Sequence, residues 1–139
     1  MLPKWHFLLG IIFCILLYLL FPSIGYINLL IVFFSSFFID VDHYFYYALR
    51  KKDWNLKRAI DWHYKLPKYH KPMFHIFHSI EFIIFLFILS FHSTILFFIL
   101  LGIVFHSLID IFDMMFRKRM GQREFLAFRF LLSNKNNYL

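Results

Sequence analysis

The sequence predicts an all-α integral membrane protein with four antiparallel transmembrane helices, arranged as two hairpins. The chain of 139 residues is 61% hydrophobic and 24% aromatic, which is more apolar surface than a soluble core of this size can bury. It contains four apolar stretches, each about long enough to cross a hydrocarbon core of roughly 30 Å. All fifteen Lys and Arg residues lie outside the two short connectors Pro22–Tyr26 and Ser90–Thr94. These observations together predict one membrane domain, residues 1–139.

The four stretches are predicted to form pairs, each joined by a short turn. The first turn contains Pro22 and Gly25, and no small-x-small cleavage site follows the first stretch, so we interpret it as a span and not as a secretory signal peptide. The predicted spans are residues 5–21, 24–39, 73–91 and 94–112, with a loop at 40–72 and a tail at 113–139.

The positions of the basic residues predict the orientation in the membrane. Short cytoplasmic loops retain Lys and Arg, whereas short translocated loops avoid them. The basic residues fall at Lys4, in the loop Arg50–Lys71 and in the tail Arg117–Lys135, so both termini are predicted to face the cytoplasm. The sequence thus predicts a multi-pass protein of the inner, or cytoplasmic, membrane. The net charge of +7 follows from this topology, so membrane lipids and not nucleic acids are the predicted partners. The sequence leaves the oligomeric state open.

Two short interfacial helices are predicted on the cytoplasmic side. The first follows Asp53, which is its predicted N-cap, and the second follows Gly121. Both have apolar residues at helical spacing beside basic residues, which is typical of helices that lie on headgroups. The apolar residues are Leu56, Ala59, Ile60 and Tyr64 in the first helix and Phe125, Phe128 and Leu132 in the second.

Polar residues interrupt three of the apolar stretches, each time at the predicted cytoplasmic end. Within each cluster, separations of three or four residues place side chains on one helix face. Half-buried carboxylates repel one another unless a cation lies between them. Imidazole and carboxylate ligands suit zinc, manganese or non-haem iron better than calcium, so the predicted cofactor is a divalent metal, zinc first. The clusters are Asp40, Asp42 and His43; His75, His78 and Glu81; and His106, Asp110 and Asp113.

Three motifs from these clusters, in this order, resemble the YdjM-like family of membrane-bound metal-dependent hydrolases. The resemblance runs from the second span to Asp110, and the ordered set is far more specific than any one motif. The motifs are Asp40-Val41-Asp42-His43, His78-Ser79 and Gly102-x-x-x-His106-x-x-x-Asp110. By this resemblance the metal ligands are Asp42, His43, His78, His106 and Asp110.

The resemblance implies a metal-dependent hydrolase embedded in the membrane. Placement at the cytoplasmic headgroups suggests an ester or phosphoester of an amphipathic, lipid-like substrate, with a carboxylate as the base. The candidate bases are Glu81 first and then Asp40 and Asp113; the side chains expected to support the ligands are His75, Ser79 and Ser107; and the residues expected to hold a phosphate or headgroup are Lys68, Lys71, Arg117 and Arg119.

Two other classes of protein fit the sequence. A non-catalytic membrane scaffold would use a structural metal or a polar cluster to join the hairpins, and would close the coordination shell. A metal or proton transport protein would carry polar groups through the membrane midplane, whereas the outer halves of these stretches are almost purely apolar. The remaining polar residues are predicted to be packing residues: His6, His63, His70, His92 and Cys14.

Overall fold

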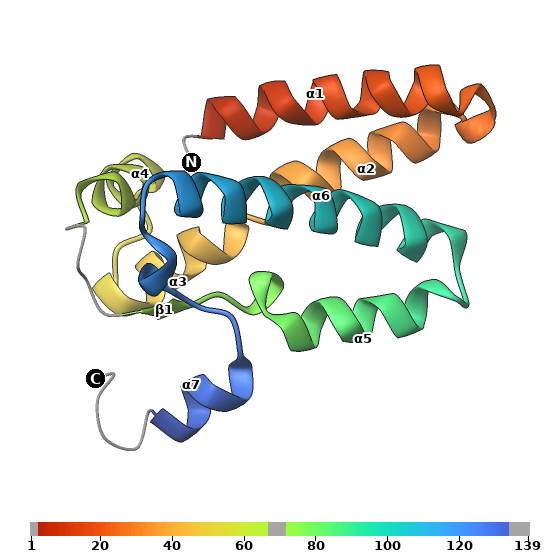
Figure 1. Ribbon diagram of the computed structural model, residues 1–139. Helices are drawn as coiled ribbons and strands as arrows, with labels where there is room; N and C mark the ends of the chain where they lie inside the picture. The colour runs from red at the N-terminus through yellow and green to blue at the C-terminus, as the bar shows by residue number, and fades with distance from the viewer. Residues whose placement is uncertain (1–2, 67–71, 134–139) are drawn as a thin grey trace.

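The computed structural model describes residues 3–66 and 72–133, and these residues are mostly helical. Four apolar helices lie side by side in a row (Figure 1). In this row α6 lies between α2 and α5, and α1 packs on the other side of α2, so the two hairpins meet along α2 and α6. The four helices are α1 (Pro3–Leu20), α2 (Tyr26–Phe38), α5 (Ile80–Ser90) and α6 (Thr94–Phe116).

The other helices and both strands gather at one end of this row, and the two hairpin turns lie at the opposite end (Figure 1). The two strands form a parallel pair that joins the segment before α5 to the segment after α6. These elements are α3 (Val41–Lys51), α4 (Leu56–Lys65), β1 (Met73–Phe74), β2 (Arg123–Glu124) and α7 (Ala127–Ser133), with 3-10 turns at Ile76–His78 and Met120–Gln122. A third 3-10 turn, Pro22–Ile24, joins α1 to α2 at the opposite end.

Two helices are long and apolar enough to cross a membrane by length and composition: the continuous segment Tyr26–Lys51 and the helix Thr94–Phe116. The helices α1 and α5 are apolar but shorter. The 11 residues of α5 span about 16 Å, roughly half of a hydrocarbon core. The expected third span began at Met73, whereas the helix begins at Ile80 because a strand and a 3-10 turn precede it. Four full spans are therefore not shown.

The segment Tyr26–Lys51 bends where α2 passes into α3. Ile39 keeps helical backbone angles, but Asp40 has ψ near −3° and ends the regular helix. The N–H of His43 donates to the carbonyl of Asp40 at 3.1 Å, which starts the next helix. The sequence predicted a loop from residue 40 onward. The helix α3 instead places Asp42 and His43 in its first turn.

Two apolar clusters hold the row together. One joins α5 and α6 to the end of α2, and the other joins α1, α2 and α6. The stacked rings of Phe13 and Phe105, with centroids 3.8 Å apart, tie α1 directly to α6. The buried members are Ile39, Leu86, Leu100 and Ile103 in the first cluster and Leu17, Val32 and Phe98 in the second.

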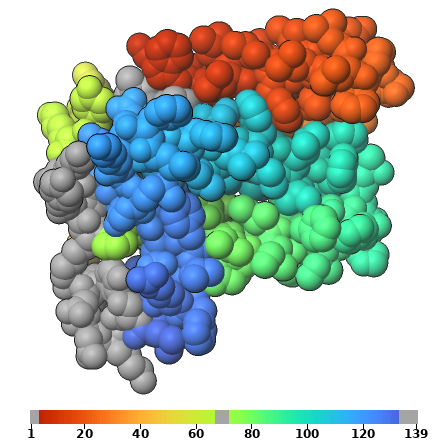
Figure 2. Space-filling model, viewed as in Figure 1, coloured from red at the N-terminus to blue at the C-terminus, as the bar shows by residue number. Residues whose placement is uncertain are grey.

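Large apolar side chains also cover the outside of the row. Leu20 is 70% exposed and Ile27 is 75% exposed, and other large apolar side chains are exposed along each of the four helices. The side chains of α1, α6 and α5 fill the face seen in Figure 2. A water-soluble monomer seldom exposes an apolar surface of this extent, which is typical of proteins that contact a membrane or a partner.

The cap of α4 differs from the predicted one. Asn55 is the N-cap, and its side chain accepts the N–H of Arg58 at 3.0 Å. The prediction of Asp53 is wrong because its carboxylate accepts the Tyr47 hydroxyl at 2.6 Å and pairs with Arg58 at 3.2 Å. The hydrogen bond from Tyr47 holds the pKa of Asp53 below its usual value. The second predicted helix after the last span is present as α7.

Gly102 sets the distance between α2 and α6. A Cβ at this position would overlap the carbonyl oxygen of Val32 and the hydroxyl group of Ser35 on the facing helix. Packed helix backbones do not yield readily to such an overlap. Only glycine therefore allows the approach that the structure shows.

We predict that Gly102→Ala lowers the free energy of unfolding by about 1–3 kcal/mol, because the added methyl group overpacks the contact between the two helices. The measurement is unfolding of the detergent-purified protein by heat or denaturant. Gly121→Ala is the matched control, since a Cβ there meets no atom within 4 Å. Equal unfolding midpoints for the two variants would contradict the close contact.

Candidate metal centre

Eight His and Asp side chains converge where the four-helix row meets the smaller elements. They form three overlapping groups, and within each group one donor atom per residue lies within 4.8 Å of the others. The chain reaches this place from α1, from the bend after α2, from α3, from the segment before α5 and from α6. The eight residues are His6, Asp40, Asp42, His43, His75, His78, His106 and Asp110.

The spacing of the donor atoms suits a small cation. Asp40 Oδ1 lies 3.3 Å from His106 Nε2, 3.5 Å from His43 Nε2 and 3.7 Å from His78 Nε2. Ligands in a tetrahedral zinc site with bonds of about 2.0–2.1 Å are about 3.3 Å apart. The carboxylate therefore lies close to three imidazole nitrogens, and two of these residues, His43 and His78, form one of the groups together with Asp40 and Asp110.

His106 is oriented by the helix it faces. Its Nδ1 lies 2.6 Å from the carbonyl oxygen of Ser36. A carbonyl only accepts hydrogen bonds, so Nδ1 carries a proton, and Nε2 is the ring nitrogen that faces Asp40. This arrangement, with the second ring nitrogen held by a hydrogen bond, is the usual one for a histidine that binds metal.

Asp42 orients His78 in a similar way. Its Oδ2 accepts the N–H of Phe77 at 3.1 Å and lies 3.1 Å from His78 Nδ1, which leaves His78 Nε2 as the free donor atom. The other carboxylate oxygen, Oδ1, lies 3.8 Å from His75 Nδ1. Burial lowers the pKa of His75 and of His78, which precede α5, so both rings are neutral and able to bind a metal.

Several buried nitrogen and oxygen atoms that could bind a metal have no hydrogen-bond partner within the described part of the chain. Leaving a buried polar atom unpaired costs about 1–3 kcal/mol, and folded proteins seldom gather several in one place. Bound metal would satisfy such atoms. These atoms are Asp42 Oδ1, His75 Nδ1, His78 Nε2 and His106 Nε2.

His6 belongs to the centre, although the sequence predicted a packing role for it. Its side chain is almost fully buried, and its ring stacks on that of His106 with centroids 4.2 Å apart. Its Nε2 lies 3.2 Å from Asp110 Oδ1 and 4.0 Å from Asp40 Oδ2. This role could have been predicted from the position of His6 in the sequence. It lies at the predicted cytoplasmic end of the first apolar stretch, the same end at which the three clusters interrupt the other stretches.

Arg123 also contacts the centre, a role that was not predicted from the sequence. One of its terminal nitrogens donates to Asp110 Oδ2 at 2.7 Å and to His43 Nε2 at 3.3 Å. Its position depends on the parallel pairing of β1 and β2, in which Met73 lies opposite Arg123. The guanidinium thus brings a permanent positive charge among the carboxylates.

The predicted bases fall in three different places. Asp40 lies among the donors, whereas Glu81 and Asp113 lie outside all three groups. The carboxylate of Glu81 accepts the N–H of Phe128 at 3.2 Å, near the start of α7. Asp113 pairs with Arg117 at 2.9 Å, one turn along the same helix. The carboxylate of Glu81 thus caps α7 apart from the donors, and its role as a base stays a prediction.

The predicted supporting residues are divided in the same way. His75 lies among the donors, while Ser79 caps α5 by accepting the N–H of Phe82 at 3.3 Å. Ser107 is buried in α6, one residue after His106. Among the predicted phosphate-binding residues, Arg117 is held by Asp113, and the N–H of Arg119 donates to the carbonyl of Met114. Lys68, Lys71 and His70 lie outside the described residues.

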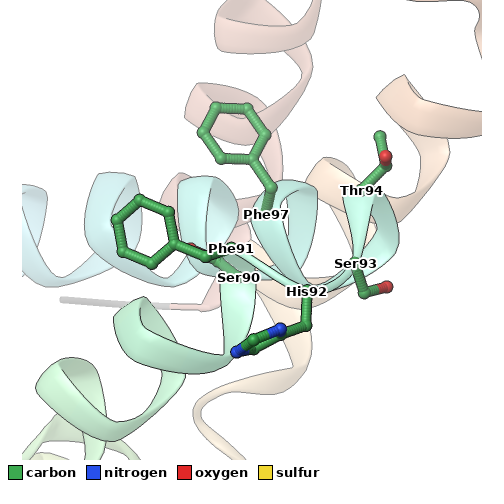
Figure 3. Close-up of a pocket in the computed structure, with 6 residues that line it drawn as sticks. All are labelled: Ser90, Phe91, His92, Ser93, Thr94 and Phe97. Atoms are coloured by element: carbon green, nitrogen blue, oxygen red, sulfur yellow. The ribbon is translucent and has the colours of Figure 1, made fainter.

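A pocket at the turn between α5 and α6 lies at the opposite end of the molecule (Figures 1 and 3). His92 is the only titratable side chain among the residues that line it, which are Ser90, Phe91, His92, Ser93, Thr94 and Phe97. It contains no second donor for a metal. The predicted packing role of His92 stays a prediction.

No protein-family model, curated protein or solved structure matches this chain. Two side chains of the centre are partly exposed, those of Asp40 (30%) and His43 (22%), whereas those of His78 and His106 are buried. Such a site can hold a cation and admit a small ligand beside it.

We expect Asp42→Asn to weaken zinc binding by about 10–100-fold, because the neutral amide loses the negative charge beside His78 Nδ1 and has one oxygen where the carboxylate has two, facing His78 and His75. The measurement is zinc competition with a chromogenic chelator in detergent. Asp53→Asn is the matched control, since Asp53 pairs with Tyr47 and Arg58 outside the donor groups. Unchanged zinc affinity in Asp42→Asn would contradict the orienting role.

Proposed function

We propose that this chain is a membrane-embedded metal-dependent hydrolase that acts at the level of the cytoplasmic headgroups. Its substrate would be an ester or phosphoester of an amphipathic, lipid-like molecule. One observation carries the proposal: buried His and Asp donors without hydrogen-bond partners among the described residues converge beside the partly exposed Asp40. The resemblance to the YdjM-like hydrolases supports the reaction class, because all five residues that it implicates are among the eight side chains of the centre.

The residues of the centre can be given distinct roles. The candidate ligands would hold divalent metal, His78 and Asp110 in one of the donor groups and His106 in another, with zinc preferred over manganese or iron for this mixture of donors. A cation bound there supplies an activated water near neutral pH and polarises the ester oxygen. Asp40, the most exposed carboxylate of the centre, is placed to accept a proton from water. Arg123 is placed to face an anionic oxygen of the substrate.

Location in the membrane is supported by the outer surface and by the distribution of charge. The apolar side chains exposed on the four-helix row suit lipid, and α1 and α5 would complete four spans in a locally thinned bilayer. The centre lies at the end of the row that carries the basic segments, which the positive-inside rule assigns to the cytoplasm. The exposed apolar residues Leu56, Ile60, Phe128 and Leu131 suit interfacial helices at the same level.

A scaffold is the second candidate, and one observation favours it. The polar contacts of the centre join separate elements: His106 binds the carbonyl of Ser36, and Arg123 pairs with Asp110. A bound metal could stabilise these contacts between elements without catalysing any reaction. A transport protein is less favoured, because two apolar clusters fill the described helices beyond the centre, where a polar path would have to run.

We predict that the purified protein contains zinc or a similar metal and hydrolyses phosphoester or lipid substrates. His78→Ala and His106→Ala should each lower turnover by about 100-fold or more, since each removes a ligand. His92→Ala, at the opposite end, should keep both metal and turnover. The measurements are elemental analysis and substrate hydrolysis in detergent.

Three outcomes separate the candidate functions. Turnover that a chelator abolishes and zinc restores supports the hydrolase. Bound metal that raises the unfolding temperature without any hydrolysis supports the scaffold. Wild-type protein that contains no metal, although it was purified without chelator, would overturn both.

The predicted orientation, with the centre on the cytoplasmic side, can be tested by labelling single cysteines introduced into the Cys14→Ser variant. Ser23→Cys lies in the exposed turn between α1 and α2 and should react with an impermeant maleimide in intact cells. Lys57→Cys, on the exposed surface of α4, should react only after the membrane is permeabilised. The reverse pattern would contradict the cytoplasmic placement of the centre.

A further inference from the structure

The eight donors contain two sets of three that share no residue. The first trio is His6, Asp40 and His106, and the second trio is Asp42, His43 and His75. We infer that the centre holds two divalent cations at once, one in each trio, and that its substrate is anionic. The inference rests on the metal centre of the proposed function and adds the number of ions and the charge of the substrate.

The first trio faces α6. His106 Nε2 lies 3.3 Å from Asp40 Oδ1, and His6 Nε2 lies 4.0 Å from Asp40 Oδ2. Asp110 borders this trio, because its Oδ1 lies 3.2 Å from His6 Nε2 and its Oδ2 lies 3.7 Å from His106 Nε2. Three protein ligands are enough for a zinc ion that keeps its fourth position open.

The second trio faces the segment before α5. Asp42 Oδ1 lies 3.8 Å from His75 Nδ1 and 4.0 Å from His43 Nε2. The ring centroids of His43 and His75 are 3.7 Å apart. Two imidazoles and one carboxylate are the protein ligands of many catalytic zinc and non-haem iron sites, in which other positions stay open. This trio is therefore suited to a cation that also binds water or substrate.

Each trio has a buried donor atom without a hydrogen-bond partner among the residues that the structure describes. In the first trio this atom is His106 Nε2, and in the second trio these atoms are His75 Nδ1 and Asp42 Oδ1. Both imidazole side chains are only 1% exposed, so water cannot readily serve them. A single cation in the first trio would leave the atoms of the second trio unsatisfied.

The number of donors and their proximity also favour two ions. A zinc ion takes four ligands and an octahedral ion takes six, which is fewer than the eight donors present. The trios are adjacent, because His43 Nε2 of the second lies 3.5 Å from Asp40 Oδ1 of the first. His78 lies between them, within 3.1 Å of Asp42 and 3.7 Å of Asp40. Paired metals about 3.5–4 Å apart are a common arrangement in enzymes that cleave phosphoesters.

The charge of a two-ion centre selects the substrate. Two divalent cations together with Arg123 carry more positive charge than Asp40, Asp42 and Asp110 can neutralise. An anionic phosphoester would remove this excess, whereas a neutral carboxylic ester would not. Arg123, whose side chain is 10% exposed, offers a guanidinium that suits the oxygens of a phosphate group.

The decisive measurement is the number of ions bound per chain. Protein stripped with a chelator, reloaded with zinc and desalted should contain two zinc ions per chain by elemental analysis. His6→Gln and His75→Gln should each contain one, because each variant disables a different trio. His92→Gln is the matched control and should contain two. Only variants that elute as monodisperse protein are compared.

Other stoichiometries would overturn the inference. One zinc ion per chain in the wild type, or loss of both ions in either variant, contradicts two separate trios. If a wild type with one ion still hydrolyses esters, this inference fails and the proposed function stands. If the wild type binds no ion, both fail.

A second measurement needs no variant. The wild type loaded with manganese(II) should give the electron paramagnetic resonance spectrum of an exchange-coupled pair, and inorganic phosphate should change that spectrum. The spectrum of isolated ions would overturn the two-ion centre. A coupled spectrum that millimolar phosphate leaves unchanged would overturn the anionic substrate.

Discussion

The structure depends on the burial of three carboxylates beside five imidazoles at one end of a row of apolar helices. Removing charged groups from water is costly, and like charges placed together add repulsion, so such a cluster needs positive charge within it. Arg123 supplies one positive charge through its pair with Asp110. The remaining donors are spaced so that a metal ion could supply the rest.

The contact that packs α2 against α6 also builds the centre. Gly102 lets α6 approach the carbonyl oxygen of Val32. One helical turn further along both helices, the same approach brings His106 to the carbonyl of Ser36, which fixes the ring and exposes its Nε2 to Asp40. The glycine and the histidine of the Gly-x-x-x-His motif therefore act together. Gly102 sets the distance between the two helices, and at this distance the ring of His106 can reach the carbonyl of Ser36.

Much of the centre could be predicted from the sequence, because its clusters depend on local spacing. Asp40 with His43, and His106 with Asp110, share a helix face whatever the rest of the chain does. His6 and Arg123 are single residues, and their roles depend on which elements lie beside them. The contact of Glu81 could not be predicted for the same reason, since only the return of the chain into α7 brings Phe128 to its carboxylate.

The helical fold was also predictable in type, but the extent of its helices was not. Hydropathy does not distinguish an apolar helix from an apolar strand. Residues 73–79 read as part of a span, yet Met73 and Phe74 pair with β2 and Ser79 caps the helix that follows. The same applies at Asp40, where a bend and not a loop ends α2. Both departures from regular helix lie at the centre and place its donors.

The exposure of the donors bears on the choice between catalyst and scaffold. A purely structural metal site is closed, because all its ligands come from the protein and an open position would admit competing ligands. In this centre the side chains of Asp40 and His43 are 30% and 22% exposed, whereas that of Asp110 is 4% exposed. The chain therefore buries the donors that would fix a cation and leaves accessible the edge where water and substrate would bind. A centre that only joined helices would gain nothing from this asymmetry, since covering Asp40 would strengthen every contact around it.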